Sequence, residues 1–403
     1  MGAGTLVELI SRGQQDTYII GNPQMSYFTS VYKRHTNFST EPIRQIFNEI
    51  ADFGKKVTCI IEKKGDILSD ILLDIELPAL ANNVSWTNGI GNFMIDYIEL
   101  QLGGEPIDRI YGDMMDIWYE LTTDLSVKNA YYKMVGKFIT FTRTSQTGAL
   151  HLLVPLPFWF CRSISQALPL ISMQYTDVKV IVQFKSFEQC WYKKTDALPP
   201  ANIHITAASL ICNFVFLDVF ERTKFAKTQL YEFLIEQFQI NNSYSMVATT
   251  INFNVPLNFN HPIKELYWTY RTNIATQNND YYNYGNILNS NTVNEQNIEP
   301  FTNVQLKYNG NNRFEILPAV FFRLYQQYKH HSSFADAYVY IYTFALEPED
   351  HQPSGTCNFS KLDDVRFNFT MCPSIDEGIV NVYAVNYNVL RIQQGMCGIM
   401  FSS

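Results

Sequence analysis

The stretch Ile98-Glu99-Leu100-Gln101-Leu102-Gly103-Gly104 predicts one strand and the turn that ends it. Apolar and polar residues alternate up to Leu102, which is typical of a strand with one buried face, and the glycine pair favours a turn. About 200 residues further on, Val304-Gln305-Leu306-Lys307-Tyr308-Asn309-Gly310 repeats this pattern. The two stretches together indicate a duplicated fold.

The elements that follow each turn also recur in the same order. Each turn is followed by an arginine, an amphipathic segment, a strongly apolar strand and a strand with an acidic and then a basic residue. The first set is Asp108-Arg109, Met114–Leu121, His151–Leu156 and Thr176–Val180, and the second is Arg313-Phe314, Phe321–Tyr328, Tyr338–Leu346 and Asp363–Phe367. Few residues are identical between the sets, so the duplication is inferred from the order of the elements.

Strand-like patterns predominate in the rest of the chain. Runs of β-branched and aromatic residues with a period of two lie between Gly, Pro and Asn residues, for example at 56–62, 93–102, 178–184 and 337–346. Helical periodicity is confined to three short segments, Asp113–Thr122, Ala226–Phe238 and Pro318–Tyr328. This pattern predicts an all-β protein built from sandwiches, with a few short helices.

The composition limits the possible functions. Charged residues are only 17% of the 403, which favours a subunit that hides much of its surface against partners. The formal net charge is −8 and no run of Lys and Arg exceeds two residues, so binding of nucleic acid through a basic face is not expected.

The cysteines and the N-terminal sequence indicate the cellular compartment in which the chain is made. The seven cysteines are scattered singly, which predicts free thiols in a reducing compartment. No signal-peptide pattern begins the chain, and the most apolar stretch, Ala207–Phe220, is too short to span a bilayer. We therefore expect a soluble protein that is made in the cytosol.

Residue patterns for catalysis and metal binding do not occur in the sequence. No histidine has a His or Cys partner at metal-ligand spacing, and His330-His331 are expected at a solvated helix end. Neighbouring acids that could form a glycosidase pair are Asp113/Asp116, Glu347/Glu349/Asp350 and Asp363/Asp364. Adjacent acids on a strand point to opposite faces, and the acids beside Pro348 are expected in solvent. We therefore predict no catalytic residues, no metal site and no cofactor.

Five Asn-x-Ser/Thr sequons are the possible modification sites. They lie at Asn37, Asn83, Asn241, Asn358 and Asn368. Without a signal peptide the chain does not enter the secretory pathway. These asparagines would therefore be glycosylated only by an enzyme outside that pathway.

The longer motifs resemble those of the major capsid proteins of nucleocytoplasmic large DNA viruses. The most specific is Phe344-Ala345-Leu346-Glu347-Pro348-Glu349-Asp350-His351-Gln352-Pro353-Ser354-Gly355. The other matching stretches are Gly13–Phe28, Val31–Phe38, Phe53–Val57, Gly65–Asp70, Phe216–Arg222, Phe259–Leu266, Asn358–Ser360, Ala384–Ile392 and Gly395–Phe401. They span the whole chain, which is somewhat shorter than familiar members and must therefore have trimmed outer loops.

The resemblance implies an all-β fold of two tandem eight-stranded antiparallel jelly rolls, with short helices in the loops and the linker. With the divide placed just after Arg222, the expected domains are an N-terminal arm (1–24), a first jelly roll (25–225), a helical linker (226–238) and a second jelly roll (239–403). The Asn- and Tyr-rich segment Asn273–Pro300 would be an exterior loop.

The resemblance also implies a structural capsid protein that is not an enzyme. Homotrimers would form the pseudo-hexagonal capsomers of a large icosahedral double-stranded DNA virus. The implied partners are neighbouring capsomers, minor capsid proteins and an internal virion membrane near the arm, without direct contact to nucleic acid. The protein would be found in the virion, after synthesis and assembly in the host cytoplasm.

Two alternatives remain open from the sequence. A minor or paralogous coat protein of the same family would carry the same motifs and would differ in its copy number per particle. A carbohydrate-binding or carbohydrate-cleaving jelly roll would use the aromatic and acidic residues instead.

Overall fold

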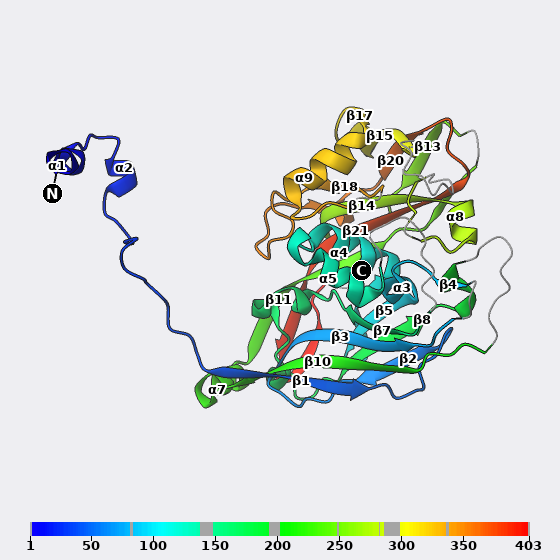
Figure 1. The fold of residues 1–403 in the computed structure, drawn as a ribbon, viewed down its shortest axis with the longest axis horizontal. Coiled ribbons are helices and arrows are strands. Elements are labelled where there is room, and N and C mark those ends of the chain that lie inside the picture. The colour runs from blue at the N-terminus through cyan, green and yellow to red at the C-terminus, as the bar shows by residue number, and fades with distance from the viewer. Residues whose placement is uncertain are drawn as a thin grey trace. The chain divides into compact units, whose positions relative to one another are not determined.

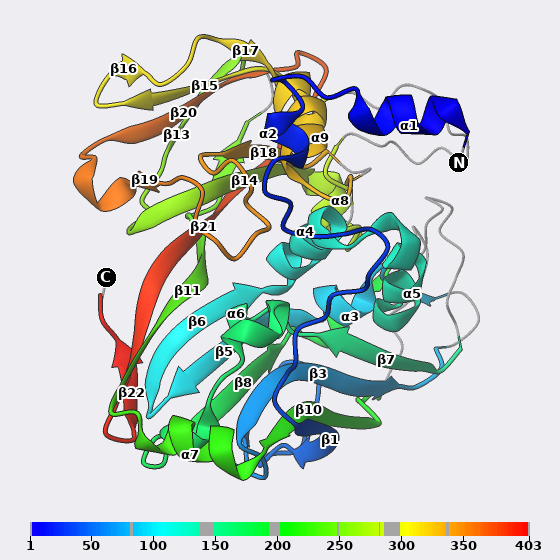
Figure 2. The same ribbon diagram turned by 90° about the vertical axis from the view of Figure 1, so that its left-hand side faces the viewer.

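The computed structural model describes residues 2–80, 84–137, 148–192, 202–247, 250–281, 283–285, 299–335 and 338–401. They belong to two compact units, Met1–Phe38 and Ser39–Ser403, and each unit is considered by itself. The larger unit holds the strands and most of the helices (Figures 1 and 2).

The first half of the larger unit is a sandwich of two four-stranded sheets. One sheet has the order β1-β10-β3-β7 and the other β2-β8-β5-β6. The pairs β10–β3, β3–β7, β2–β8, β5–β8 and β5–β6 are antiparallel. The strands are β1 (Phe38–Ile46), β2 (Lys56–Ile60), β3 (Ile67–Leu77), β5 (Ile95–Leu102), β6 (Glu105–Tyr111), β7 (Leu150–Pro155), β8 (Val178–Phe184) and β10 (Ala207–Leu217).

The second half repeats this topology strand by strand. Its main sheets run β11-β21-β14-β18 and β13-β20-β15-β16. The strands are β11 (Leu230–Ile240), β13 (Asn252–Pro256), β14 (Pro262–Thr272), β15 (Phe301–Tyr308), β16 (Asn311–Asn312), β18 (Tyr340–Thr343), β20 (Val365–Met371) and β21 (Gly378–Gln393). With these eight strands counted along each half, both halves have the sheet orders 1-8-3-6 and 2-7-4-5, which is the order of a jelly roll. The predicted all-β double jelly roll is therefore confirmed.

The repeated turn that suggested the duplication joins the fourth and fifth strands of each roll. Leu102 pairs with Glu105 across Gly103-Gly104, and Tyr308 pairs with Asn311 across Asn309-Gly310. The φ angles are 62° and 90° in the first turn and 47° and 81° in the second. Two consecutive positive φ angles are what a two-residue hairpin with the right-handed strand twist requires, and Gly and Asn tolerate them best.

Short elements complete the two rolls. The additional strands are β4 (Ser85–Trp86), β9 (Trp191–Tyr192), β12 (Tyr244–Met246), β17 (Leu317–Pro318), β19 (Cys357–Asn358) and β22 (Met396–Ile399). The α-helices of this unit are α3 (Ile90–Phe93), α4 (Gly112–Thr122), α5 (Leu125–Val135), α6 (Trp159–Arg162), α7 (Val219–Lys227), α8 (Asn273–Gln277) and α9 (Gln326–His330). A π-helical turn, η4 (Phe321–Tyr325), leads directly into α9. The predicted helices at Asp113–Thr122 and Pro318–Tyr328 are thus confirmed to within a few residues.

The predicted helix Ala226–Phe238 is wrong over most of its length. Helix α7 begins earlier, where Asp218 accepts a hydrogen bond from the backbone N–H of Val219, and β11 follows it. Strand β11 pairs with β21 along its whole length, from Leu230 opposite Gln393 to Ile240 opposite Tyr383. Leu, Glu and Gln favour helices intrinsically, but this long ladder and the packing of its faces outweigh the propensity.

The expected exterior loop Asn273–Pro300 is also partly wrong. It begins with α8, and Tyr281 and Tyr284 are buried. The side-chain amide of Asn279 donates hydrogen bonds to backbone carbonyls of the first roll, at Glu188 and Trp191. The polar composition of this stretch reflects bonds to another part of the chain, so residues 273–281 are a contact between the rolls. Residues 286–298 lie outside the described part of the chain.

The seven cysteines are free thiols in the structure, as predicted. Cys59, Cys190 and Cys212 are fully buried and the other four are half-buried. Burial raises the pKa of the Cys59 thiol to about 11, so this group is unreactive in the folded chain.

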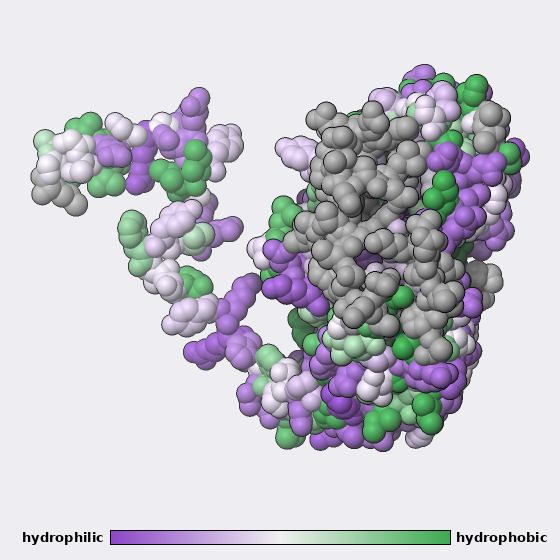
Figure 3. Space-filling model, turned by 45° about the vertical axis from the view of Figure 1, so that its right-hand side comes forward, coloured by the Kyte–Doolittle hydropathy of each residue, from purple (hydrophilic) through white to green (hydrophobic). Residues whose placement is uncertain are grey.

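The smaller unit, Met1–Phe38, is an arm without a core of its own. It contains α1 (Ala3–Ile10) and α2 (Thr17–Ile20), neither of which has a buried residue. Large aliphatic and aromatic side chains are exposed along it, and Figure 3 shows green hydrophobic patches on this arm between paler and purple residues. They include Val7, Ile10, Tyr18, Ile19, Tyr27, Phe28, Val31 and Tyr32. Within the described residues, no helix is long and apolar enough to cross a membrane.

Candidate functional site: the seam between the two rolls

The two rolls share a buried boundary, which we call the seam. On one side lies the outer face of the sheet β11-β21-β14-β18, and on the other lie α4, α5, α6 and β6 of the first roll (Figure 2). Tyr267, Tyr383 and Val385 from this sheet belong to the same hydrophobic cluster as the core of the first roll. Phe238 of β11 packs edge-on against Trp118 of α4, with 5.5 Å between the ring centroids. The rolls are therefore joined by a continuous apolar core.

Strand β14 explains how one strand serves two cores. Leu266, Trp268 and Tyr270 point into the second roll, where they pack with the inner faces of its two sheets. The alternate residues, such as Tyr267 and Arg271, point into the seam. A strand that is covered on both faces has a nearly continuous hydrophobic sequence without a polar alternation. Its sequence alone therefore does not show which residues belong to which core.

The first charged cluster of the seam is built around Glu236 of β11. One carboxylate oxygen lies 2.6 Å from the Nζ of Lys264, and the other accepts a hydrogen bond from Arg162 of α6. The guanidinium of Arg162 lies 4.1 Å from the centre of the Trp118 ring. Burial lowers the pKa of Lys264, and the carboxylate of Glu236 partly offsets this. The cluster bridges the rolls, because Arg162 belongs to the first and Glu236 to the second.

A second charged cluster joins Asp113 of α4 to Arg271 of β14. Asp113 Oδ2 lies 3.1 Å from the Nη1 of Arg271, and Lys185 approaches Asp113 Oδ1 to 3.9 Å. Burial alone would raise the pKa of Asp113, but the two cations hold it below its usual value. Arg271 also donates to the backbone carbonyl of Tyr281 at 2.9 Å. This pair again crosses from one roll to the other.

The remaining acids of α4 are neutralised by lysines that follow α4. Lys137 Nζ lies 2.8 Å from Asp116 and 2.7 Å from Glu120, and Lys128 lies 2.9 Å from Glu120. Lys128 also donates to the hydroxyl of Ser333 and to the carbonyl of Phe334 in the second roll. The loop after α9 is thereby bound to α4 and α5.

His331 forms the third charged cluster, at the end of α9. Its Nε2 lies 2.6 Å from Glu265 and its Nδ1 lies 2.9 Å from Glu349, and its side chain exposes no surface. Burial alone lowers the pKa of His331, but the two carboxylates outweigh it and raise the pKa to about 9. The imidazole is therefore charged at neutral pH. The predicted solvated helix end is wrong for His331, because the chain folds the loop containing Glu349 over it.

Of the candidate carboxylates, the neighbours Glu349 and Asp350 line a cavity of about 460 Å³ together with Glu236. Asp113 and Asp116 each have their own cation, and Glu349 is bound to His331 rather than free in solvent, which corrects the expectation for that acid. Asp364 forms an exposed pair with Arg366. In the described ranges, no group of three or more His, Cys, Asp or Glu side chains is placed to hold a metal ion. The charged groups of the seam form ion pairs that connect the two rolls.

The sequons differ in their accessibility. Asn37 and Asn358 are exposed, and Asn368 is half-buried within β20. Asn241 is 4% exposed, and its Nδ2, the atom that would carry a glycan, donates to the carbonyl of Pro256 at 2.7 Å. Asn83 lies outside the described residues.

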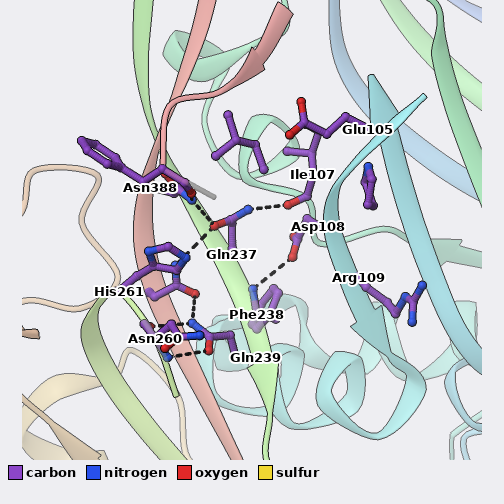
Figure 4. A pocket seen from close by; sticks show the side chains of 14 residues that line it. Glu105, Ile107, Asp108, Arg109, Gln237, Phe238, Gln239, Asn260, His261 and Asn388 are labelled. Carbon is purple, nitrogen blue, oxygen red and sulfur yellow. Dashed lines mark hydrogen bonds between the residues drawn. The ribbon is translucent and has the colours of Figure 1, made fainter. Parts of the chain in front are cut away.

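A groove of about 320 Å³ opens at the edge of the seam, beside β6 and β11 (Figure 4). Amide side chains line it, but they bind one another and the backbone. Gln239 donates to Asn386 and to the carbonyl of Asn260, while Gln237 accepts from Asn388 at 3.0 Å. These amides are bound within the chain, whereas the buried Oδ2 of Asp108, which also lines the groove, has no hydrogen-bond partner among the described residues.

The charges of the seam were not predicted from the sequence. Arg162, Glu236, Lys264 and Arg271 come from separate elements, and neither spacing nor motif relates them. The available signal was the presence of Lys264, Glu265 and Arg271 in the largely buried strand β14, since buried charges in a strand require partners.

Comparisons with known proteins agree with this architecture. Residues 26–218 match the family model "Major capsid protein N-terminus", and residues 221–398 match "Large eukaryotic DNA virus major capsid protein". The major capsid protein of Pyramimonas orientalis virus is 35% identical, and that of Paramecium bursaria Chlorella virus 1 is 33% identical, each over the full length of both chains. A chain of the PBCV-1 virus capsid model is 31% identical, with a TM-score of 0.80 over 94% of this chain and 100% of that one. The Faustovirus major capsid protein shares the fold, with a TM-score of 0.76 at 13% identity.

Proposed function

The chain belongs to the family of major capsid proteins of large eukaryotic DNA viruses, and from this membership we propose that three copies form one pseudo-hexagonal capsomer of an icosahedral shell. The chain acts as a structural coat subunit of the virion.

The observation that carries the proposal is the strand-by-strand repetition of the two rolls across a buried seam. A close-packed facet surrounds each building block with six neighbours. Three copies of a chain with two similar rolls present six similar edges, provided that the rolls keep a fixed orientation. The shared core and the clusters at Glu236 and Asp113 supply that rigidity.

We also propose how the chain is divided. The arm, expected as 1–24, precedes a first roll of about 25–225 in the predicted division. The second roll begins with β11 at Leu230 rather than at residue 239, because β11 is the first strand of its sheet.

The arm is proposed to lie on the inner side of the shell, near an internal membrane and minor capsid proteins. Its exposed apolar side chains support this, because such residues gain free energy when a partner covers them. Assembly in the host cytoplasm is part of the same proposal.

Light scattering on the purified chain tests the capsomer. We expect a mass three times 46.6 kDa that persists on dilution to micromolar concentration. A chain that stays monomeric at high concentration would contradict the proposal. The copy number per particle separates a principal subunit, at thousands of copies, from a minor paralogue, at tens.

We propose no catalytic activity for this chain. Asp113, Asp116 and Glu236 at the seam are each bound to a cation, which disfavours them as the acid or base of the carbohydrate-cleaving alternative.

A further inference from the structure

Three buried side chains of the first roll bring one amine against two carboxyl groups. Lys137 follows the end of α5, and Asp116 and Glu120 lie one helical turn apart on α4. The Nζ of Lys137 lies 2.8 Å from both carboxylate oxygens of Asp116 and 2.7 Å from the Oε1 of Glu120. The three side chains are at most 1% exposed. A single amine is thus shared by two acids that solvent does not reach.

The local backbone fixes the position of this amine. Gly136 ends α5 with a φ of 68°, and the backbone N–H of Lys137 donates to the carbonyl of Tyr132 at 2.7 Å. A glycine with positive φ is a common end of a helix, and it sets the direction in which the chain leaves. The N–H of Gly89 donates to the carbonyl of Gly136 at 3.2 Å, which binds this turn to the chain before α3. The backbone therefore holds the Lys137 side chain at the acids.

The surroundings distinguish the two acids. Burial raises the pKa of Asp116 above its ordinary value, although Lys137 acts in the opposite direction. Burial would also raise the pKa of Glu120, but Lys137 and Lys128 outweigh it and lower that pKa. The Nζ of Lys128 lies 2.9 Å from the Oε2 of Glu120 and serves as its counter-ion. The environment therefore favours Asp116 as the protonated acid and Glu120 as the carboxylate.

We propose that Lys137 and Asp116 condense to an intramolecular amide, an isopeptide bond, with Glu120 as the base. The Nζ of Lys137, as the neutral amine, bonds to the Cγ of Asp116, the Cγ–Oδ2 bond of the protonated acid breaks, and one water leaves. Glu120 accepts a proton from the attacking nitrogen and returns it to the departing oxygen. The step therefore requires no oxidant, reductant or other reactant. Each chain modifies itself once, and the inference does not depend on the proposed trimer.

The polar groups around the two acids suit this reaction. The Nδ2 of Asn92 donates to the Oδ1 of Asp116 at 3.3 Å, and this oxygen remains as the carbonyl of the new amide. A donor at this oxygen stabilises the negative charge that develops on it during the attack. The hydroxyl of Tyr132 donates to the Oε2 of Glu120 at 2.9 Å, while the Oε1 of Glu120 lies at Lys137. The nucleophile, the acid and the base are thus in contact before the bond forms.

Burial also favours the amide over the ion pair. A buried charge loses its hydration, and this cost can exceed the attraction between the two partners. The amide is neutral, so the condensation removes two charges from the interior. Reactants that are held in contact behave as though one were present at about 10⁵–10⁸ M. The exposed pair of Lys64 and Glu62, at a similar 2.8 Å, lacks this drive because water solvates both charges.

The bond gives the first roll a cross-link that its cysteines do not provide. All seven cysteines are free thiols. An amide between Asp116 and Lys137 joins α4 to the end of α5, and a cross-link of this kind restricts the unfolded chain. Helix α4 also carries Trp118 and Asp113, which contact the second roll. The link therefore fastens the helix on which the second roll packs.

Intact-mass spectrometry of the full chain, denatured after purification, tests the bond. We expect the wild type to be lighter than its sequence by the mass of one water, and peptide mapping should find a branched peptide that joins residues 116 and 137. Lys137→Met and Glu120→Gln should have their full sequence masses. Lys133→Met is the matched control, because Lys133 is an exposed lysine of α5, and it should keep the loss of one water.

Asp116→Asn distinguishes this bond from other losses of water. An asparagine at this position condenses with Lys137 by releasing ammonia, so this variant should be lighter by one ammonia instead of one water. The wild type and this variant give an answer even if Lys137→Met does not fold. A wild-type chain at its full sequence mass, with separate linear peptides for 116 and 137, would overturn the proposal. A loss of water that persists in Lys137→Met would overturn it as well, because that loss does not involve the lysine.

Discussion

The Nε2 of His331 lies 2.6 Å from the Oε1 of Glu265, and neither side chain exposes any surface. The second ring nitrogen is bound to Glu349, so the imidazole is held between two carboxylates on the seam side of β14. These contacts link the end of α9 to β14 and to the loop 346–356. The loop belongs to the sequence motif that is most specific to the family, so the motif includes an acid that neutralises a buried histidine.

The stability of the chain should depend on pH through His331. Its pKa is raised from 6.5 to about 9, so its contribution is complete below pH 6.5 and is lost as the pH rises through about 9. A shift of this size corresponds to about 3 kcal/mol. We expect His331→Gln to lower the melting temperature at pH 6 and to remove most of the decline in melting temperature that is expected for the wild type between pH 7 and pH 9. His204→Gln, at a side chain that is 69% exposed, should preserve the wild-type profile. An unchanged profile in His331→Gln would show that the cluster does not control the stability.

The cluster at Glu236 should be costly to break. Glu236→Gln leaves Arg162 and Lys264 buried without an anionic partner, and loss of one partner of a buried pair costs about 3–5 kcal/mol. The measurement is chemical denaturation of the full chain. The matched control is Glu232→Gln on the same strand, because the Glu232–Arg391 pair is exposed and should contribute less than about 1 kcal/mol. Equal losses in the two variants would contradict the assignment of Glu236 to the seam.

Gly355 should not tolerate a side chain. Its φ is 149°, and an added Cβ would overlap the backbone oxygen of Phe344. We expect Gly355→Ala to destabilise the chain by about 2 kcal/mol, measured by denaturation. Gly148→Ala is the control, since nothing lies within 4 Å of the position its Cβ would take. A Gly355→Ala chain as stable as the control would mean that the loop adjusts freely.

Modification of the sequons should follow their exposure. Peptide mapping by mass spectrometry of the chain from purified particles should find Asn241 unmodified, because its amide is buried and bound to Pro256. Asn358 is the exposed sequon of the second roll with which Asn241 is compared, and its side chain is accessible to a modifying enzyme. A glycan mass on Asn241 would show that attachment precedes folding.

Much of the fold was predictable because its signals are local. The alternation in Ile98–Leu102 and the turn at Gly103-Gly104 depend on neighbouring residues, and so do their counterparts at Val304–Tyr308 and Asn309-Gly310. The segment 230–238 was mistaken for a helix because its strand character comes from pairing with β21, which is distant in the sequence. The solvated end expected at His331 failed for a similar reason, since Glu265 is 66 residues away.

The sequence by itself determined that the protein is a duplicated all-β chain of this capsid family, because alternation, turn residues and motifs are read from neighbouring positions. The tertiary structure alone decided which charges are buried and how the two rolls are joined. Arg271 and Asp113 are 158 residues apart and meet only when the outer face of one sheet packs on a helix of the other roll. Such a pair depends on the packing of whole elements, and no local pattern contains it.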